Sequence, residues 1–194
     1  GGRNRLLPQS GILIFDEAHK LLDAARQMYG MTFDAAELEQ LVSSAYRSVG
    51  GISDRKEAVL LCGELLRLNS LLFEVVRQEA GVHYDKGCQA FDFTQRSIRI
   101  LNTLAATLGR LSLCFYLPKA GNAHKRLLNR MEQEQAKLSV LLDSSESICW
   151  LEYTGVSTYR LCTLPKALDF LLYEDIWNQE TPCMLTSATL SIGG

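Results

Sequence analysis

The sequence lacks the clustered cysteines, long apolar runs and signal peptide that mark several classes of protein. None of its six cysteines lies within four residues of another, which excludes a zinc ribbon or a local run of iron–sulfur ligands. No apolar run approaches the length that crosses a bilayer, and the first residues do not have the pattern of a signal peptide. We therefore expect a cytoplasmic protein without a membrane partner, in which the cysteines are mostly reduced core residues.

The sequence also has no excess of basic charge. Its 20 Lys and Arg residues are balanced by 22 Asp and Glu residues, and the net charge is −2. This balance excludes a nucleic-acid signature of the whole chain, so any such contact would depend on a local patch. With 194 residues, the chain is long enough for one good core or two small ones.

The most informative feature that is present is an apolar segment that ends in two acids. Residues 11–15 form a continuous apolar run, which is typical of a strand covered on both faces in a parallel sheet, and Asp16-Glu17-Ala18-His19 follows directly. Acids after a strand can also cap the following helix, where the helix dipole favours them. A second short buried strand is predicted at 183–186, and it leads into Ser187-Ala188-Thr189.

Helical spacing dominates the region between these two strands. Apolar residues recur every three or four positions, and such stripes are typical of a packed core. Asp34 and Thr94 are candidate N-caps, and segment 83–93, which has no period, is predicted to be a loop. We expect the long helices, joined by short loops, to pack antiparallel into a bundle. They are predicted from Asp34 to the glycines at 50–51, from Ser53 or Asp54 to Gly81, from Thr94 to a turn at 118–122, and from about Ala123 to Asp143.

A period of two appears after residue 145. Residues 148–153 and 158–162 are typical of a hairpin with a Gly-led two-residue turn, which would place Cys149 opposite Cys162 as a register and not as a disulfide. The same register places Trp150 opposite Leu161. A further helix, with Pro165 in its first turn, is predicted to run through Ile176. The sequence therefore predicts a mainly α protein, α+β overall, with a helical bundle, an incomplete α/β lobe and a short β-hairpin.

Two small groups of basic residues are candidates for contact with a phosphate backbone. Arg96 and Arg99, with Arg110, lie on the third long helix, and Tyr116 or Phe115 would offer a face on which a base could stack. A solvated helix face is the commoner explanation of such residues, and Glu132 and Glu134 dilute the positive field. The second group surrounds the turn before the fourth long helix and consists of Lys119, His124, Lys125, Arg126 and Arg130.

A phosphate-binding loop is missing, because no Gly-x-x-x-x-Gly-Lys-Ser/Thr segment occurs in the sequence. In P-loop ATPases an Asp at the tip of a strand holds Mg²⁺, and a Glu beside it orients and deprotonates the attacking water. Such acids act only when the phosphates are held next to them. We therefore expect Asp16 and Glu17 to be half of an active site, and the 194-residue chain by itself not to hydrolyse ATP.

The tetrad Asp16-Glu17-Ala18-His19 resembles motif II of the superfamily 2 helicases, and segment 185–190 resembles motif III. Together with Leu6-Leu7-Pro8 and the long helical region between the motifs, the chain resembles the DinG branch of the XPD/DinG helicases, in which a helical arch domain is inserted at this place. The resemblance spans the chain in organisation and is residue-specific at the two motifs. It implies that residues 1–30 and 146–194 are part of a RecA-like helicase domain 1, that residues 31–145 are the arch, and that the chain begins just before motif II and stops just after motif III.

The resemblance also implies an activity, which is that of an ATP-dependent DNA helicase that moves 5′ to 3′ on single-stranded DNA. ATP and Mg²⁺ would be the cofactors, and the rest of the motor, with its phosphate-binding loop and second motor domain, would be a partner. Asp16 would hold the metal, Glu17 would be the catalytic base, and His19 would link the nucleotide site to motif III through Ser187 and Thr189. Many members bind a 4Fe–4S cluster through cysteines upstream of motif II, and the cysteines here match none of those positions, so the cluster is neither implied nor excluded.

Two other functions remain open on the sequence alone. The chain could be a free-standing helical module that binds nucleic acid or protein, with a coincidental Asp-Glu-Ala-His tetrad. It could also keep the helicase fold and serve nuclease or other nucleic-acid processing. A phosphate-binding loop upstream of Asp16 in the parent coding sequence would separate the motor from the free-standing module.

Overall fold

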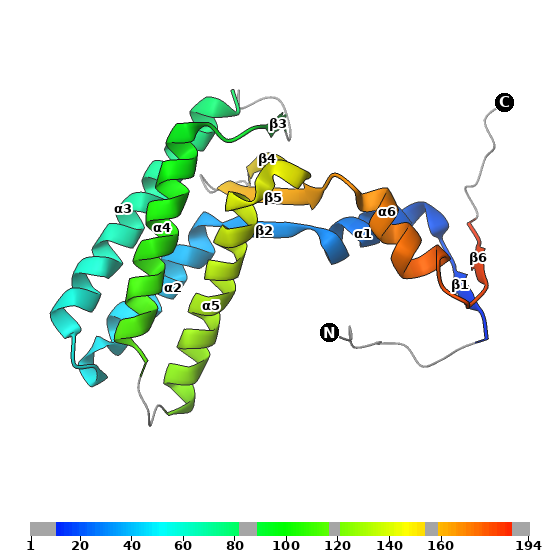
Figure 1. Cartoon of the computed structure of the whole chain (residues 1–194). Coiled ribbons are helices and arrows are strands. Elements are labelled where there is room, and N and C mark those ends of the chain that lie inside the picture. Colours follow the sequence, from blue (N-terminus) through cyan, green and yellow to red (C-terminus); the bar gives the residue numbers. More distant parts are fainter. Residues whose placement is uncertain (1–10, 82–88, 117–120, 154–158, 188–194) are drawn as a thin grey trace. The chain divides into compact units, whose positions relative to one another are not determined.

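The computed structural model describes residues 11–81, 89–116, 121–153 and 159–187, which belong to two compact units (Figure 1). One unit contains residues 31–163, and the other contains residues 1–30 and 164–194. Helices account for most of the described residues and strands for a small part, so the fold is mainly α and α+β overall, as the sequence predicts. No helix in the described residues is both long and apolar enough to cross a membrane.

Four long helices form most of the unit that contains residues 31–163. They are α2 (Ala35–Ser48), α3 (Arg55–Glu79), α4 (Gln95–Cys114) and α5 (Asn122–Leu142), and successive helices run in opposite directions (Figure 1). Helix α2 packs against α3 and α5, and helix α4 packs against the same two helices, so the four close into a bundle. The expected antiparallel bundle is therefore confirmed.

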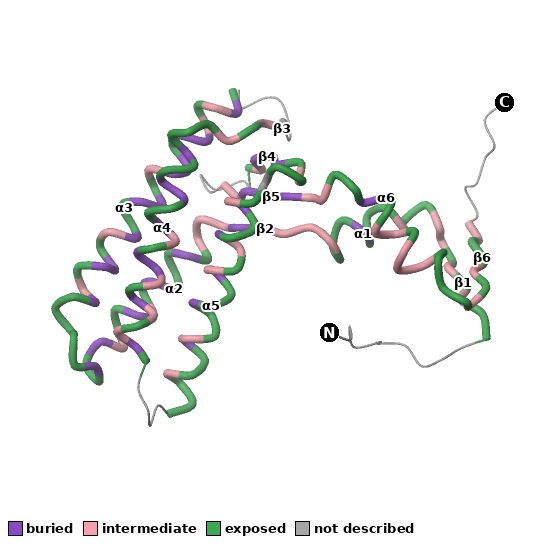
Figure 2. The backbone as a smooth tube through the Cα atoms, viewed as in Figure 1, coloured by how far each residue is buried: buried purple, intermediate pink, exposed green. Residues whose placement is uncertain are grey.

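The inward faces of these helices bury an apolar core (Figure 2). Each helix contributes side chains that recur every three or four residues, which is the spacing that keeps them on one face. The largest fully buried side chains on the four helices are Leu38, Leu41, Leu65, Leu72, Leu101, Leu104, Leu108, Leu111, Met131 and Leu138. The stripes that the sequence predicts are thus core, and burial of these side chains is the main source of the stability of the bundle.

Two of the predicted helix caps are present. The Asp34 carboxylate accepts a hydrogen bond from the backbone N–H of Ala36 at 2.8 Å, and the Thr94 hydroxyl accepts one from the N–H of Arg96 at 3.1 Å. Each bond satisfies an N–H group that has no partner within the first turn of its helix. Asp54 precedes α3 without such a side-chain bond.

A four-stranded sheet packs onto the same core. Its order is β2 (Met31–Asp34), β5 (Tyr159–Pro165), β4 (Ser147–Tyr153) and β3 (Gln89–Phe91). Strand β2 runs antiparallel to β5, β3 runs antiparallel to β4, and their buried side chains Phe33, Leu151 and Leu161 join the core of the bundle. Strands β4 and β5 are neighbours in the sheet, as the predicted hairpin requires, and its predicted turn lies outside the described residues. Strands β2 and β3 are too short for a recognisable period, so the sequence did not predict them.

The hairpin register and the next helix differ from the prediction. The Glu152 carboxylate contacts the Arg160 guanidinium at 2.6 Å, and the rings of Tyr153 and Tyr159 lie 5.3 Å apart. Side chains opposite each other in antiparallel strands share a face, so these contacts place the pairing one residue away from the register with Cys149 opposite Cys162. Pro165 ends β5 and does not start a helix, because α6 begins at Leu168.

The boundary between the units also lies later than predicted. The sequence placed the return from the helical insert at residues 145 and 146, whereas the structure divides the chain at residues 163 and 164. The reason is strand pairing: β4 and β5 lie between β2 and β3, so they belong to the unit of the helices. Residues 146–163 are therefore part of the helical unit.

The other unit is small and is built on two parallel strands. Strand β1 (Leu13–Phe15) pairs with β6 (Cys183–Leu185), as the predicted parallel sheet requires. The helical turn η1 (Ala18–Lys20), helix α1 (Leu21–Tyr29), helix α6 (Leu168–Leu172) and the π-helical turn η4 (Tyr173–Trp177) complete it, and α1 packs against α6. The expected cover on both faces of the strands is not present among the described residues, since Ile14 is 61% exposed and Met184 is 50% exposed.

Candidate functional site

The two parallel strands bring the predicted motifs to one edge of the sheet. Phe15 lies opposite Leu185 in the β1–β6 pair, so the residues that follow each strand emerge side by side. Backbone bonds continue past the strands: the N–H of Thr186 donates to the carbonyl of Phe15 at 2.8 Å, and the N–H of Ala18 donates to the carbonyl of Thr186 at 2.8 Å. The carboxyl ends of parallel strands are where open α/β sheets bind their ligands.

The Asp16 carboxylate is fixed by two hydrogen bonds to one of its oxygens. Its Oδ1 atom accepts from the Thr186 hydroxyl at 2.9 Å and from the backbone N–H of Glu17 at 2.9 Å. Among the described residues, Oδ2 has no hydrogen-bond partner. The carboxylate is therefore held in one orientation and keeps one oxygen for a cation or a water molecule.

Glu17 has a left-handed backbone conformation, with φ of 54° and ψ of 48°. It is the only residue other than glycine with a positive φ in the described part of the chain. This conformation costs a residue with a side chain roughly 1–2 kcal/mol, and such strain is found most often at active sites and ligand clamps. Two backbone bonds fix this conformation: the N–H of the next residue, Ala18, donates to the Thr186 carbonyl, and the N–H of Lys20 donates to the Glu17 carbonyl, both at 2.8 Å.

His19 connects Glu17 to the segment after β6. Its Nδ1 atom lies 2.9 Å from the Ser187 hydroxyl oxygen and 3.1 Å from the Glu17 Oε2 atom. The predicted hydrogen bond between His19 and Ser187 is thus present, and the same ring nitrogen is within reach of the acid. Ala188 and Thr189, the other residues predicted at this place, lie outside the described residues.

Thr186 is the residue of this cluster to which the sequence assigned no role. A hydroxyl directly after β6 lies at the same level as the acid directly after β1, because the strands are parallel and in register. The sequence alone could not indicate this neighbour of Asp16, because the contact depends on the register that pairs Phe15 with Leu185.

The acids offer two carboxylates to a cation and no more. The described residues contain no group of three or more His, Cys, Asp or Glu side chains that could hold a metal ion by themselves. A donor set of one or two carboxylates is nonetheless the set with which proteins commonly hold Mg²⁺, the remaining ligands being waters and substrate phosphates. Asp16 and Glu17 therefore fit a metal–nucleotide complex better than an isolated ion.

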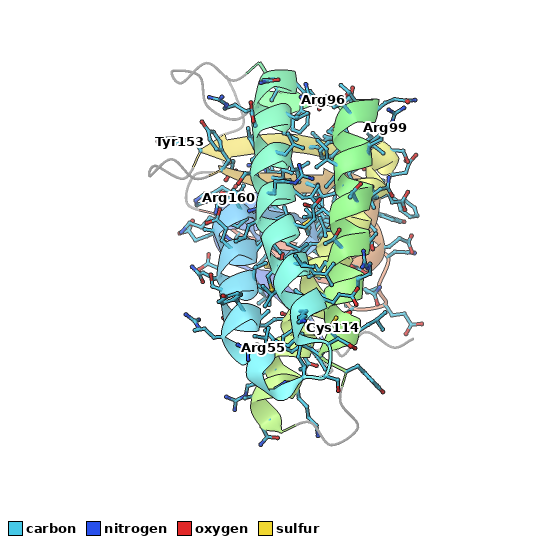
Figure 3. The ribbon with its side chains drawn as sticks, turned by 90° about the vertical axis from the view of Figure 1, so that its left-hand side faces the viewer. Arg55, Arg96, Arg99, Cys114, Tyr153 and Arg160 are labelled. Carbon is cyan, nitrogen blue, oxygen red and sulfur yellow. The ribbon has the colours of Figure 1, made fainter. Side chains whose placement is uncertain are left out.

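The two predicted groups of basic residues lie on different helices, α4 and α5. Arg96 and Arg99 lie at the start of α4, and Cys114 marks the other end of that helix (Figure 3). Lys125 and Arg126 lie in the first turns of α5, which runs antiparallel to α4, so they are roughly 25 Å along the bundle from Arg96 and Arg99.

Two other residues of the predicted groups differ from the expectation, and a third lies outside the described residues. Arg110 is paired with Glu57 at 2.6 Å. Phe115 is fully buried and packs against the ring of His124, so it cannot be a stacking face, whereas Tyr116 is exposed. Lys119 lies outside the described residues.

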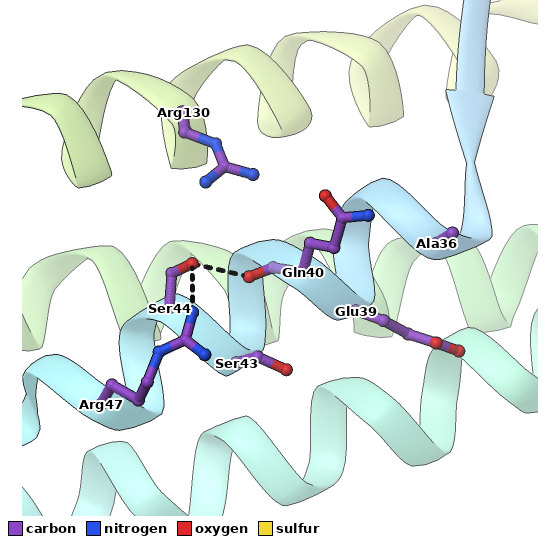
Figure 4. A pocket seen from close by; sticks show the side chains of 7 residues that line it. All are labelled: Ala36, Glu39, Gln40, Ser43, Ser44, Arg47 and Arg130. Carbon is purple, nitrogen blue, oxygen red and sulfur yellow. Dashed lines mark hydrogen bonds between the residues drawn. The ribbon is translucent and has the colours of Figure 1, made fainter.

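Arg130 lies one turn after Arg126 on α5 and lines a polar groove between α2 and α5 (Figure 4). The groove has a volume of about 460 Å³. The sequence did not predict it, although polar residues recur every three or four positions along the exposed face of α2. The lining residues are Ala36, Glu39, Gln40, Ser43, Ser44, Arg47 and Arg130.

The chain is similar to a probable ATP-dependent helicase, YpvA, of Bacillus subtilis (strain 168). The two are 25% identical over 209 aligned positions, which include the whole of this chain. The chain spans 30% of the length of that relative. No protein-family model matches the chain. The similarity supports a relation to ATP-dependent helicases and does not specify a branch among them.

Proposed function

We propose that the chain is part of a DinG-like ATP-dependent DNA helicase, which couples ATP hydrolysis to 5′–3′ movement on single-stranded DNA and to unwinding. The observation that carries the proposal is the contact of His19 Nδ1 with Ser187 Oγ at 2.9 Å, at the common tip of two parallel strands. This contact joins the Asp-Glu-Ala-His tetrad to the Ser-Ala-Thr segment, as the resemblance requires. The similarity to a probable ATP-dependent helicase supports the same class.

In this site Asp16 would hold the Mg²⁺ of a bound ATP. Its Oδ1 atom is occupied by Thr186 and by the backbone of Glu17, so Oδ2 is the oxygen that faces the metal or one of its waters. Mg²⁺, when bound, supplies neutralisation of the phosphate oxygens. Thr186 keeps the carboxylate from rotating and thus acts as a positioning residue.

Glu17 would orient the attacking water and accept its proton. The left-handed backbone of this residue directs its side chain differently from that of a residue that continues the strand. Because His19 Nδ1 is within reach of both Glu17 and Ser187, a change in the position of either partner alters the environment of the other. That three-residue chain is the route by which nucleotide state would be passed to the segment after β6.

The helical bundle would be the arch that guides single-stranded DNA, and the phosphates of ATP would be held by another part of the motor. Two features support the proposal that another part of the motor holds the phosphates. The sequence has no Gly-x-x-x-x-Gly-Lys-Ser/Thr segment. The strands β1 and β6 expose Ile14 and Met184, which are apolar side chains of the kind that helices cover in a complete α/β domain.

The test is the DNA-stimulated ATPase and unwinding activity of the parent protein. Glu17→Gln should remove ATP hydrolysis while ATP still binds, because the amide keeps the shape of the side chain and cannot accept the proton. Glu74→Gln is the matched control, since Glu74 is an exposed acid on α3. A parent protein whose ATPase activity survives Glu17→Gln would contradict the proposal. Absence of any ATPase activity in the parent would favour the free-standing helical module, for which the self-contained core of the bundle is sufficient.

A further inference from the structure

A charged cluster joins α2 and α5 beside a polar groove. The Lys137 ammonium donates to the Glu37 carboxylate on α2 and to the buried Glu134 carboxylate on α5, both at 2.8 Å. Burial alone would lower the pKa of Lys137, but its hydrogen bonds to Glu134 and Glu37 outweigh this and raise the pKa, so the lysine stays charged. The wall of the groove on α2 extends from Ala36 to Arg47, and its wall on α5 is Arg130, which lies two turns before Lys137.

Two arginines line this groove from opposite walls. Arg130 extends from α5 toward α2, and Arg47 lies on α2 across the opening (Figure 4). Neither forms an ion pair within the described part of the chain. In contrast, Arg67, Arg110 and Arg160 each contact a carboxylate at 2.6 Å. The guanidinium groups of Arg47 and Arg130 are therefore not held by a carboxylate of the described residues, which leaves them able to contact an external anion.

The floor of the groove supplies neutral hydrogen-bonding groups. The Ser44 hydroxyl donates to the Gln40 carbonyl at 2.8 Å and accepts from Arg47 Nη2 at 3.4 Å, which holds the guanidinium over the floor. Ser43 and Gln40 also line the groove, and the Gln40 side-chain amide extends toward α5 (Figure 4). Glu39 is the one carboxylate of the lining, so the charged residues of the groove sum to one positive charge.

We propose that the α2–α5 groove binds a phosphodiester of single-stranded nucleic acid, with Arg47 and Arg130 contacting the same phosphate from its two sides. A planar guanidinium matches the oxygens of a phosphate and pairs with them in a bidentate manner. The volume of about 460 Å³ has room for the phosphate and the sugar beside it. This proposal rests on the proposed function, because it names the arch surface on which the strand lies. Arg130 belongs to the group that the sequence placed around the turn before α5, whereas Arg47 was not among the predicted residues.

The experiment is a fluorescence-anisotropy titration of the whole chain with a labelled oligothymidylate at several salt concentrations. Arg47→Gln and Arg130→Gln should each weaken binding, and each should lower the slope of log K against log salt by about 0.7, because one phosphate contact is lost. The double variant should be little worse than either single variant, since both arginines hold one phosphate. Arg55→Gln, which removes an exposed arginine at the start of α3, should leave the slope unchanged (Figure 3).

Two further arms separate the groove from general electrostatics and from free phosphate. Ser43→Leu fills the groove without a change of charge and should weaken binding as well. An oligothymidylate with uncharged methylphosphonates at its central positions should bind the wild type only as tightly as the native strand binds the double variant. Inorganic phosphate should compete with the strand only at high concentration. If the wild type, Arg47→Gln and Arg130→Gln have equal affinity and equal salt slope, the proposal that the groove binds the strand is wrong. The helicase proposal would still stand. Failure of the wild type to bind the strand at low salt would overturn the groove, while the ATPase test of Glu17→Gln would still decide the helicase proposal.

Discussion

His19 Nδ1 lies 2.9 Å from Ser187 Oγ, although the two residues are 168 positions apart in the sequence. The contact exists because β1 and β6 are parallel and in register, so their ends deliver His19 and Ser187 to one place. The same Nδ1 atom lies 3.1 Å from the Glu17 carboxylate. One ring nitrogen forms one full hydrogen bond, either as donor to one of the two oxygens or as acceptor from the Ser187 hydroxyl, so the two contacts compete. This competition makes the three residues a coupled unit.

The first prediction follows from that coupling. In the parent protein, Ser187→Ala should reduce unwinding by on the order of tenfold more than it reduces ATP hydrolysis, because Glu17 keeps its position but loses its link to the segment after β6. Ser70→Ala is the control, since the Ser70 hydroxyl donates to the carbonyl of Leu66 in its own helix. The two activities are measured on the same preparations. Equal losses of both would show that the hydroxyl does not couple them.

The second prediction separates the backbone role of Glu17 from its chemistry. Glycine adopts a positive φ without strain, so Glu17→Gly should stabilise this turn by about 1 kcal/mol relative to Glu17→Ala. Both variants lack the carboxylate, so both should lack its catalytic function. The measurement is hydrogen exchange at the Ala18 amide, which donates to the Thr186 carbonyl across the site. Equal protection in the two variants would mean that the left-handed conformation is not retained.

The sequence predicted the parts of this fold that depend on local physics. The caps Asp34 and Thr94 and the apolar stripes of the four helices are properties of short segments, so each could be recognised without its neighbours. Strands β2 and β3 could not, because three or four residues contain too little of a period and are defined by the partner they pair with.

The same limit applied to the candidate sites. The hydrogen bond between His19 and Ser187 was predicted from the resemblance, whereas the hydrogen bond of Thr186 to Asp16 required the register of the strands. The α2–α5 groove depends on how two helices lie together, and Arg47 has no distinguishing feature in the sequence. Residues that act through long-range juxtaposition are therefore the ones that sequence reasoning missed.

The third prediction concerns the helix caps. Asp34→Ala should lower the free energy of unfolding by about 1 kcal/mol, because the N–H of Ala36 loses its acceptor in the first turn of α2. Asp54→Ala is the matched control at the start of α3, where the aspartate side chain makes no cap bond, and it should cost clearly less. Urea denaturation of the two variants is the comparison. An equal cost would show that the charge of the residue matters and not the hydrogen bond.

The fourth prediction tests the core of the bundle with two leucines of one helix. Leu108 on α4 is 0% exposed, so Leu108→Ala should destabilise the chain by roughly 2–5 kcal/mol through lost burial and the cavity left behind. Leu113 on the same helix is 73% exposed, and Leu113→Ala should change stability by less than about 0.5 kcal/mol. Thermal and urea unfolding give both values. Similar costs at the two positions would contradict the packing of α4 described above.

The fifth prediction is a loss of stability at alkaline pH. Burial, with a smaller contribution from Cys114, raises the pKa of the Cys62 thiol from 9.0 to about 11. Between these values the unfolded chain releases the thiol proton while the folded chain keeps it, so the stabilisation is complete below pH 9 and is lost as the pH rises through 11. Cys162 acts in the same direction, since burial and then Glu152 raise its pKa to about 11. In Cys62→Ala the free energy of unfolding, measured in urea under reducing conditions from pH 8 to pH 10.5, should therefore fall less steeply than in the wild type. Other groups that titrate in this range are common to both proteins, so identical slopes would show that Cys62 does not titrate differently in the two states.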